Sequence, residues 1–191
     1  TRRFGTELAG TVFRHVKTEG KGKTYYDTAD PTSNRQKILE LVKNILQSRY
    51  VDILSVNENE AVSYASQLSD EVKELEKSLI SEELAKESAR LLALHLAARV
   101  DLHTTSFSAT FTRKGETVVP AFRVSVLRTT GAGDAWNAGN ILGDTHRLSE
   151  GGRLTLANAV AAYYISKPNG MHPTRKQLTR FCEKLKRKTP V

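Results

Sequence analysis

The sequence has a single cysteine, Cys182, among its 191 residues, and its five histidines are scattered. One thiol excludes an intramolecular disulfide and a cysteine-based zinc site, and the histidines show no metal-ligand spacing. Chains without disulfides are typical of reducing compartments, so we expect a cytoplasmic protein.

Long hydrophobic runs are also missing. No apolar run approaches the roughly 20 residues that a membrane-spanning helix needs, and no secretory leader pattern opens the chain. We therefore expect no membrane partner. The chain opens at Thr1, without a methionine and already within a helical pattern, which we interpret as a fragment whose upstream part is absent.

Positive charge is in excess, because the chain has 29 Lys and Arg residues but 21 Asp and Glu residues, which gives a net charge of +8. This balance suits nucleic acid, membrane surfaces or phosphorylated metabolites. A nucleic-acid-binding protein would concentrate its charge in a patch, whereas here the charge is mostly dispersed. Its densest stretch, RFCEKLKRKTP, reads as a last amphipathic helix and a solvated end, so we expect small-molecule partners and no nucleic acid.

Patterns typical of strands and helices alternate along the first hundred residues. Strands are predicted at KTYYDT, VDILSV and RVDLHT. Helices are predicted around 8–16, 38–46 and after Asn57, and a charged helical stretch at 69–98 breaks near SLISEE. Such alternation favours a parallel sheet covered by helices.

The second half begins with two strand patterns, SATFTRKG and ETVVPAFRV, that predict a hairpin turning at Lys114 and Gly115. Helical periodicity then follows around 133–147, 151–167 and 174–187. A chain of this length encloses one good core. We therefore predict a single α/β domain over residues 1–191.

In the stretch RTTGAGDAWNAGN, residues 128–140, two conformationally free glycines stand directly before an aspartate at the start of a predicted helix. Gly131 and Gly133 allow consecutive N–H groups to point at one spot, which suits a phosphate. Asp134, in the first helical turn, is placed to accept a proton from an attacking hydroxyl. Alternatively, Gly131 caps the helix and Asp134 complements the helix dipole. The residues alone leave both interpretations open.

This stretch closely resembles the C-terminal signature of the PfkB family of carbohydrate kinases, which have the ribokinase-like fold. The resemblance implies a three-layer α/β/α sandwich with a mainly parallel sheet. This chain would be the C-terminal two-thirds of such a kinase, without the N-terminal strands and the β lid that selects the sugar. By the same resemblance, Gly131, Ala132 and Gly133 form an anion hole for the γ-phosphate of ATP beside Thr130. Asp134 is the implied general base that deprotonates the sugar hydroxyl.

An Asn-x-x-Glu pattern follows the second predicted strand, with Asn57 and Glu60 in VDILSVNENEA. On its own it is a variant capping box. The family resemblance implies instead that the pair organises Mg²⁺, its waters and the nucleotide phosphates. Asp27 and Asp30, in YYDTADP, are candidates for lining the cleft or for turn formation.

Further nucleotide contacts are implied in two places. Asn158 and Ala161 correspond to the helix that wraps the adenine, and Gly170 to the loop after it. Thr104 and Thr105 stand where relatives carry a glycine-containing loop, and their hydroxyls are candidates to reach a phosphate.

At Arg128 the chain departs from the family pattern, because relatives open the signature with an acid. In several of them this acid and its neighbours hold potassium, so we do not expect activation by a monovalent cation here.

These observations predict a kinase that uses ATP and Mg²⁺ to phosphorylate a sugar hydroxyl. A nucleoside kinase of the same fold is the close alternative. A nucleotide- or sugar-sensing relative with reduced catalysis is also compatible, since Arg128 and the lost glycines depart from the family pattern. A homodimer is compatible with the family, whose members often pair through the lid.

Overall fold

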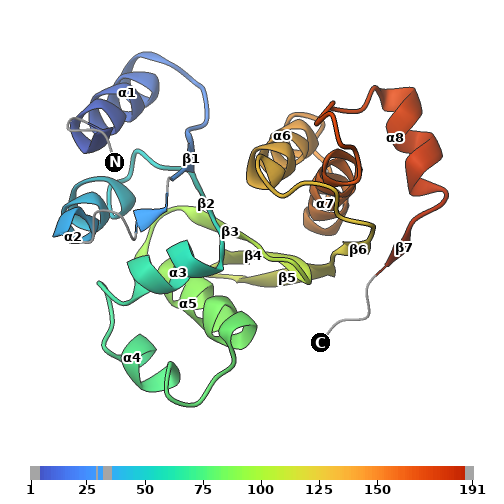
Figure 1. Cartoon of the computed structure of the whole chain (residues 1–191). Coiled ribbons are helices and arrows are strands. Elements are labelled where there is room, and N and C mark those ends of the chain that lie inside the picture. Colours follow the sequence, from blue (N-terminus) through green and yellow to red (C-terminus); the bar gives the residue numbers. More distant parts are fainter. Residues whose placement is uncertain (1–4, 29, 32–35, 188–191) are drawn as a thin grey trace. The chain divides into compact units, whose positions relative to one another are not determined.

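The computed structural model describes residues 5–28, 30–31 and 36–187, excluding the side chains of 186 and 187 (Figure 1). The chain divides into two compact units. The first comprises Thr1–Leu102 and Phe111–Glu116, and the second His103–Thr110 and Thr117–Val191. Within the described part of the chain, no helix combines the length and apolar character that crossing a membrane requires.

Five strands form one sheet in the order β1-β2-β3-β4-β5. Their bounds are β1 (Tyr25–Asp27), β2 (Ile53–Val56), β3 (Arg99–His103), β4 (Phe107–Thr112) and β5 (Gly115–Pro120). β1 pairs parallel with β2, and β2 pairs parallel with β3. Only residues 113 and 114 join β4 to β5, so these strands form an antiparallel hairpin. The predicted α/β class and its mostly parallel sheet are confirmed.

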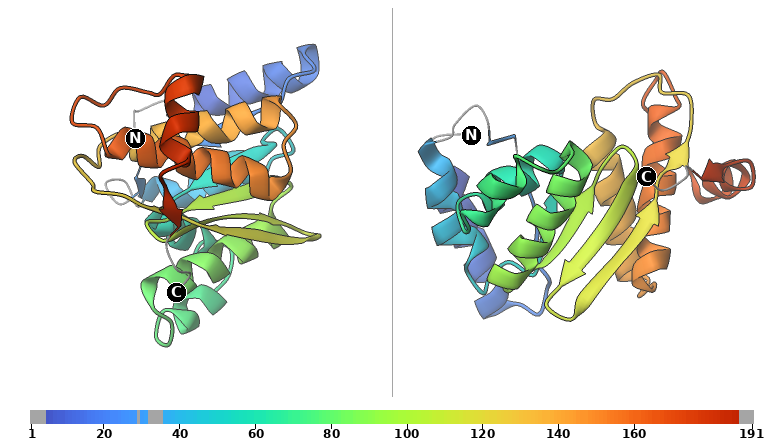
Figure 2. Two further views of the ribbon diagram at one scale, coloured as in Figure 1. Left: turned by 90° about the vertical axis from the view of Figure 1, so that its right-hand side faces the viewer. Right: turned by 90° about the horizontal axis from the view of Figure 1, so that it is seen from below.

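The helices of the first unit follow the predicted pattern. They are α1 (Gly5–Glu19), α2 (Ile38–Leu41), which continues into the π-helical turn η2 (Val42–Leu46), α3 (Glu58–Ala65), α4 (Glu71–Leu75) and α5 (Ser81–His95). α3 and α5 lie side by side (Figures 1 and 2). Leu54 and Val100, on neighbouring strands, are completely buried, so the apolar strands form the core that periodicity predicted.

In the second unit, α6 (Ala132–Thr145) packs along α7 (Glu150–Ile165), and α8 (Arg175–Cys182) contacts α7 (Figure 2). Val119 of β5, Trp136 of α6 and Leu154 of α7 belong to one buried cluster. The side chain of Arg153 is 1% exposed and donates hydrogen bonds to Asn140 and Thr110. These contacts hold α6, α7 and β4 together, and the sequence indicated none of them.

Two predicted boundaries were wrong. The stretch ETVVPAFRV was expected to form one strand, but β5 ends at Pro120 and a separate strand, β6 (Phe122–Arg123), follows. Proline has no N–H to continue a ladder. The last helix was expected to reach residue 187, but it ends at Cys182, and β7 (Lys186–Arg187) pairs antiparallel with β6. A partner strand distant in sequence overrides the local helical pattern there.

Asp52 links α1 to the start of β2. Its carboxylate accepts hydrogen bonds from Lys17 Nζ at 2.9 and 3.0 Å and from the N–H of Thr24 at 2.8 Å. Partial burial alone would raise the pKa of Asp52, but the bonds from Lys17 and Thr24 outweigh it and lower the pKa. The ionised form therefore stabilises the folded state.

We expect Asp52→Asn to lower the free energy of unfolding by about 1–2 kcal/mol at pH 7. Because the folded pKa is depressed, this stability is present above the ordinary pKa of aspartate and is lost as pH falls through the folded pKa. Urea unfolding measured from pH 7 down to acid pH checks this. Asp70→Asn, which removes an exposed pair with Lys73, is the control and should change stability little. A constant deficit at every pH would contradict the prediction.

Candidate active site

The Gly-rich stretch forms the turn into α6. Gly131 is the N-cap, and its φ of 83° lies in the left-handed region, which glycine enters without steric cost. The N–H of Ala132 donates to the carbonyl of Thr129 at 3.0 Å, so it would have to leave this bond to reach an anion. Gly133 and Asp134 lie in the first helical turn, whose N–H groups have no acceptor within the helix. With the helix dipole, such a turn favours an anion.

Asp134 occupies the third position of α6, and its side chain is exposed. An exposed carboxylate on this turn is accessible to the hydroxyl of a bound molecule while the neighbouring N–H groups hold an anion. The same position also complements the helix dipole. The local geometry therefore accommodates both interpretations of this acid.

Two side chains that the sequence did not single out lie against the turn. The hydroxyl of Tyr164 donates to the carbonyl of Thr130 at 3.2 Å, and a Cβ on Gly131 would lie 2.5 Å from this hydroxyl oxygen. A Cβ on Gly133 would lie 3.4 Å from Cε1 of His103. Tyr164 lies 34 residues from Thr130, so no spacing rule connects it with the motif.

Asn158, a predicted nucleotide contact, is 5% exposed. Its Oδ1 accepts from Ser108 Oγ at 2.5 Å and from Trp136 Nε1 at 2.9 Å, and its Nδ2 donates to the carbonyl of Pro120 at 3.2 Å. Its Oδ1 therefore already has two donors, while its Nδ2 has a second N–H besides the one that Pro120 accepts. Ala161 packs beside the cluster that contains Trp136. The contacts of both residues with a nucleotide stay predictions.

Thr104 and Thr105 follow β3. The Thr104 hydroxyl donates to the carbonyl of Phe107 at 3.0 Å and accepts from the N–H groups of Ser106 and Phe107, at 3.1 and 3.0 Å. This hydroxyl therefore organises the turn into β4, while Thr105 is exposed. Contact of either threonine with a phosphate stays a prediction.

Asn57 and Glu60 form a complete capping box at the start of α3. Asn57 Oδ1 accepts from the N–H of Glu60 at 3.0 Å, and Glu60 Oε2 accepts from the N–H of Asn57 at 2.9 Å. Burial raises the pKa of Glu60 to about 7, against the lowering effect of its bond to Asn57, and the negative charges of Asp27 and Asp30 raise it further. The local capping sequence thus places a buried acid with a raised pKa in the first turn of α3, just after β2.

Asp27 and Asp30, which the sequence placed as cleft or turn residues, lie near Glu60 in the first unit. Asp27 ends β1, paired in register with Ser55 of β2, and Asp30 accepts a hydrogen bond from Asn59 Nδ2 at 2.9 Å. Because parallel strands end at the same edge, acids from two separate segments gather there. Mutual repulsion among these carboxylates makes the location favourable for a cation.

No group of three or more His, Cys, Asp and Glu side chains arranged to hold a metal ion occurs among residues 5–28, 30–31 and 36–187. A structural zinc or calcium site needs such a cage. Magnesium does not, because it keeps most of its waters and uses one or two carboxylates with substrate phosphates. The carboxylate of Glu60 and the amide oxygen of Asn57 therefore fit magnesium as donor types.

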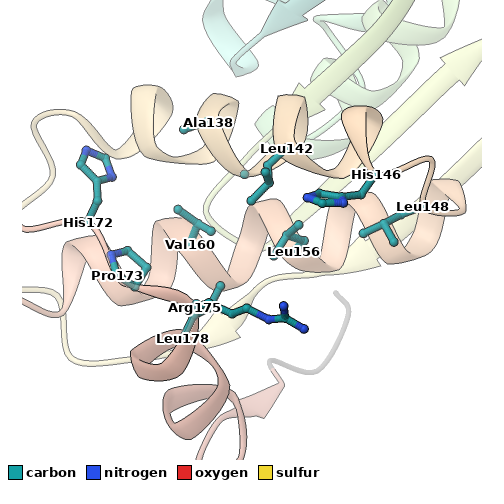
Figure 3. Close-up of a pocket in the computed structure, with 11 residues that line it drawn as sticks. Ala138, Leu142, His146, Leu148, Leu156, Val160, His172, Pro173, Arg175 and Leu178 are labelled. Carbon is teal, nitrogen blue, oxygen red and sulfur yellow. The ribbon is translucent and has the colours of Figure 1, made fainter.

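A pocket of about 770 Å³ lies between α6, α7 and α8 in the second unit (Figure 3). Leu142, Val160 and Leu178 line it together with His172 and Arg175. None of the site residues predicted from the sequence is among its lining residues. The pocket therefore does not contain the Gly-rich turn or the acid that follows it.

The family model for pfkB family carbohydrate kinases matches residues 7–177 of this chain. The structure is similar to ribokinase from Thermotoga maritima, with a TM-score of 0.63 and 19% identity over 91% of this chain and 52% of that one. Ribokinase from Cryptococcus neoformans var. grubii serotype A in complex with ADP gives a TM-score of 0.73 and 13% identity over 94% and 57%.

Aminoimidazole riboside kinase from Salmonella enterica, complexed with aminoimidazole riboside and an ATP analogue, gives a TM-score of 0.66 and 20% identity over 91% and 56%. The chain thus spans about half the length of the solved structures that it matches. No curated protein matches it in sequence. At these identities the solved structures establish the ribokinase-like fold, and the family match covers most of the chain, including the Gly-rich turn. The chain belongs to the pfkB family of carbohydrate kinases.

Proposed function

We propose that this chain carries the phosphate-transfer machinery of a kinase that moves the γ-phosphoryl group of ATP to a sugar hydroxyl. The turn into α6, with its left-handed Gly131 and the exposed Asp134 one helical turn later, is the observation that carries this proposal. Membership of a carbohydrate kinase family and relatives solved with ADP or an ATP analogue support it.

In the proposed reaction the acceptor oxygen forms a bond to the γ-phosphorus while the bond from this phosphorus to the bridging oxygen of ADP breaks. Asp134 takes the proton of the acceptor hydroxyl. The N–H groups of Gly131 and Gly133 donate to the oxygens of the moving phosphoryl group. The positive end of the α6 dipole further stabilises the negative charge of this group. Asp134 would return its proton to solvent after the products leave.

Asn57 and Glu60 would hold Mg²⁺ and its waters, in keeping with the acidic surroundings of Glu60. When bound, the ion neutralises charge on the nucleotide phosphates. A nearby cation favours the ionised form of Glu60 and so offsets the burial that disfavours it. The capping box meanwhile fixes the position of the Glu60 carboxylate.

Glu60→Gln tests this assignment while sparing the fold, because glutamine also closes a capping box. We expect the Mg²⁺ concentration for half-maximal rate to rise about 10-fold. The Mg²⁺-dependent part of nucleotide binding, measured by titration calorimetry, should weaken in parallel. Glu58→Gln, in the same helical turn, is the control and should change neither. Unchanged magnesium dependence in Glu60→Gln would rule out the assignment.

A nucleoside kinase is the second candidate, because adenosine kinase from Sinorhizobium meliloti shares the fold with a TM-score of 0.63 and 22% identity. Radiolabelled phosphate transfer from ATP to matched panels of sugars and nucleosides separates the two acceptor classes. Transfer to sugars supports the first proposal, and transfer confined to nucleosides supports the second. Tight ATP binding without transfer to any acceptor would instead identify a sensing protein with reduced catalysis.

A further inference from the structure

Arg128 begins the stretch that leads into the Gly-rich turn, and its backbone is tied to the end of α7. The N–H groups of Leu127 and Arg128 both donate to the carbonyl of Ile165, at 2.8 and 3.3 Å. The segment before the turn is thereby anchored to a helix end that follows it by almost 40 residues in sequence. The side chain of Arg128 extends from this anchored backbone.

The Arg128 guanidinium lies over the ring of Tyr164, with Cζ 4.9 Å from the ring centroid. Its Nη2 donates to the carbonyl of Thr130 at 3.4 Å, and its Nε is buried without a hydrogen-bond partner. A guanidinium held over an aromatic face gains cation–π attraction while its edge remains able to donate. The contact with the ring therefore helps to hold the cation beside the turn.

Gly170, in the loop after α7, lies against this cation. Its φ is 60°, and a Cβ there would overlap Nη1 of Arg128. The positive φ favours glycine at this position, and a larger residue would have to displace the guanidinium. The loop therefore lies directly against the guanidinium, and the half-buried Arg128 contacts the turn, the Tyr164 ring and Gly170.

The carbonyl of Thr130 thus receives two donors, the Arg128 guanidinium and the Tyr164 hydroxyl. No cis peptide bond occurs among the described residues. In a trans peptide the C=O and the following N–H point in opposite directions. Two donors behind the Thr130 carbonyl therefore direct the N–H of Gly131 away from Tyr164. They also polarise the peptide, which strengthens this N–H as a donor.

We propose that Arg128 is a positioning residue that holds the Thr130–Gly131 peptide, so that the N–H of Gly131 is directed at the transferred phosphoryl group. The proposal rests on the proposed function of the turn. Tyr164 shares the task through its hydroxyl, and Gly170 leaves the space that the guanidinium fills. Arg128 itself touches no substrate in this scheme.

The test compares wild type with Arg128→Ala, Arg128→Lys and the control Arg113→Ala, which removes an exposed arginine from the β4–β5 turn. We expect Arg128→Ala to lower kcat about 10-fold, less than the loss of an entire anion-hole donor, while KM for ATP changes little. Guanidinium chloride at low millimolar concentration should restore part of kcat in Arg128→Ala only. The kcat of Arg128→Lys should lie between those of wild type and Arg128→Ala, since lysine keeps the charge but lacks the planar guanidinium edge.

A second measurement does not depend on activity. In Arg128→Ala, amide hydrogen exchange should accelerate at residues 129–133 and in the loop 167–172, but not in the β4–β5 hairpin. Tyr164→Phe, which removes the other donor to Thr130, should combine non-additively with Arg128→Ala in kcat. Wild-type exchange at 129–133 in a folded Arg128→Ala variant, or a kcat equal to that of Arg113→Ala, would overturn the proposal. An inactive wild type with the exchange difference intact would instead count against the kinase assignment and leave the positioning contact supported.

Discussion

Asp134→Asn lowers kcat by about 100- to 10,000-fold, if Asp134 is the general base that we propose. Asparagine has nearly the same size and shape as aspartate but cannot take up the proton of the acceptor hydroxyl. Nucleotide binding should survive, because the N–H groups of the turn are unchanged. Steady-state kinetics and calorimetric titration with an ATP analogue measure the two quantities separately.

Glu150→Gln is the matched control for Asp134→Asn, since Glu150 is an acid in the first turn of α7. If Asp134 only complements the helix dipole, both variants should lose a similar fraction of a kcal/mol in stability, with little change in rate. The proposal requires a large loss of kcat in Asp134→Asn alone. Near-normal turnover in this variant would remove Asp134 from the mechanism.

The second large effect is expected at Gly131. Alanine at a φ of 83° costs about 1–2 kcal/mol, and its Cβ would lie 2.5 Å from the hydroxyl oxygen of Tyr164. Either Tyr164 leaves the Thr130 carbonyl or the turn changes shape, and both outcomes misdirect the Gly131 N–H. We expect kcat to fall about 100-fold or more, with lower thermal stability.

Gly151→Ala provides the matched comparison, because a Cβ at Gly151 meets no atom within 4 Å and the residue lies in α7. Alanine there should leave kcat unchanged and stability equal or higher. Adding Tyr164→Phe to Gly131→Ala removes the closest clash but not the backbone strain, so recovery should be partial. A Gly131→Ala variant with wild-type kcat would show that the left-handed turn is unnecessary for the reaction.

Features set by neighbouring residues were predictable from the sequence. The strand and helix alternation follows from apolar periodicity, which indicated β1 to β5 and the order of the helices. The capping box of Asn57 and Glu60 needs only a spacing of three residues, and it is complete in the structure. Likewise, a left-handed Gly131 ahead of Asp134 at a helix start follows from glycine's freedom at positive φ.

Other features needed the folded chain. The sequence did not indicate that Asn158 commits its amide to Ser108, Trp136 and Pro120, nor that β7 pairs with β6. It also identified Arg128 only as a departure from the family pattern and did not indicate its contact with the Tyr164 ring.

The sequence by itself therefore determined the class of fold, the family signature and the local turn that presents Gly131 and Asp134. The tertiary structure alone decided which side chains bond to the backbone of that turn, namely Arg128 and Tyr164 on the Thr130 carbonyl, with Gly170 against the guanidinium. The physical reason is the distance in sequence over which each kind of interaction acts. Backbone conformation responds to residues within a few positions, whereas contacts across more than 30 residues depend on how helices and loops pack, which no local pattern encodes.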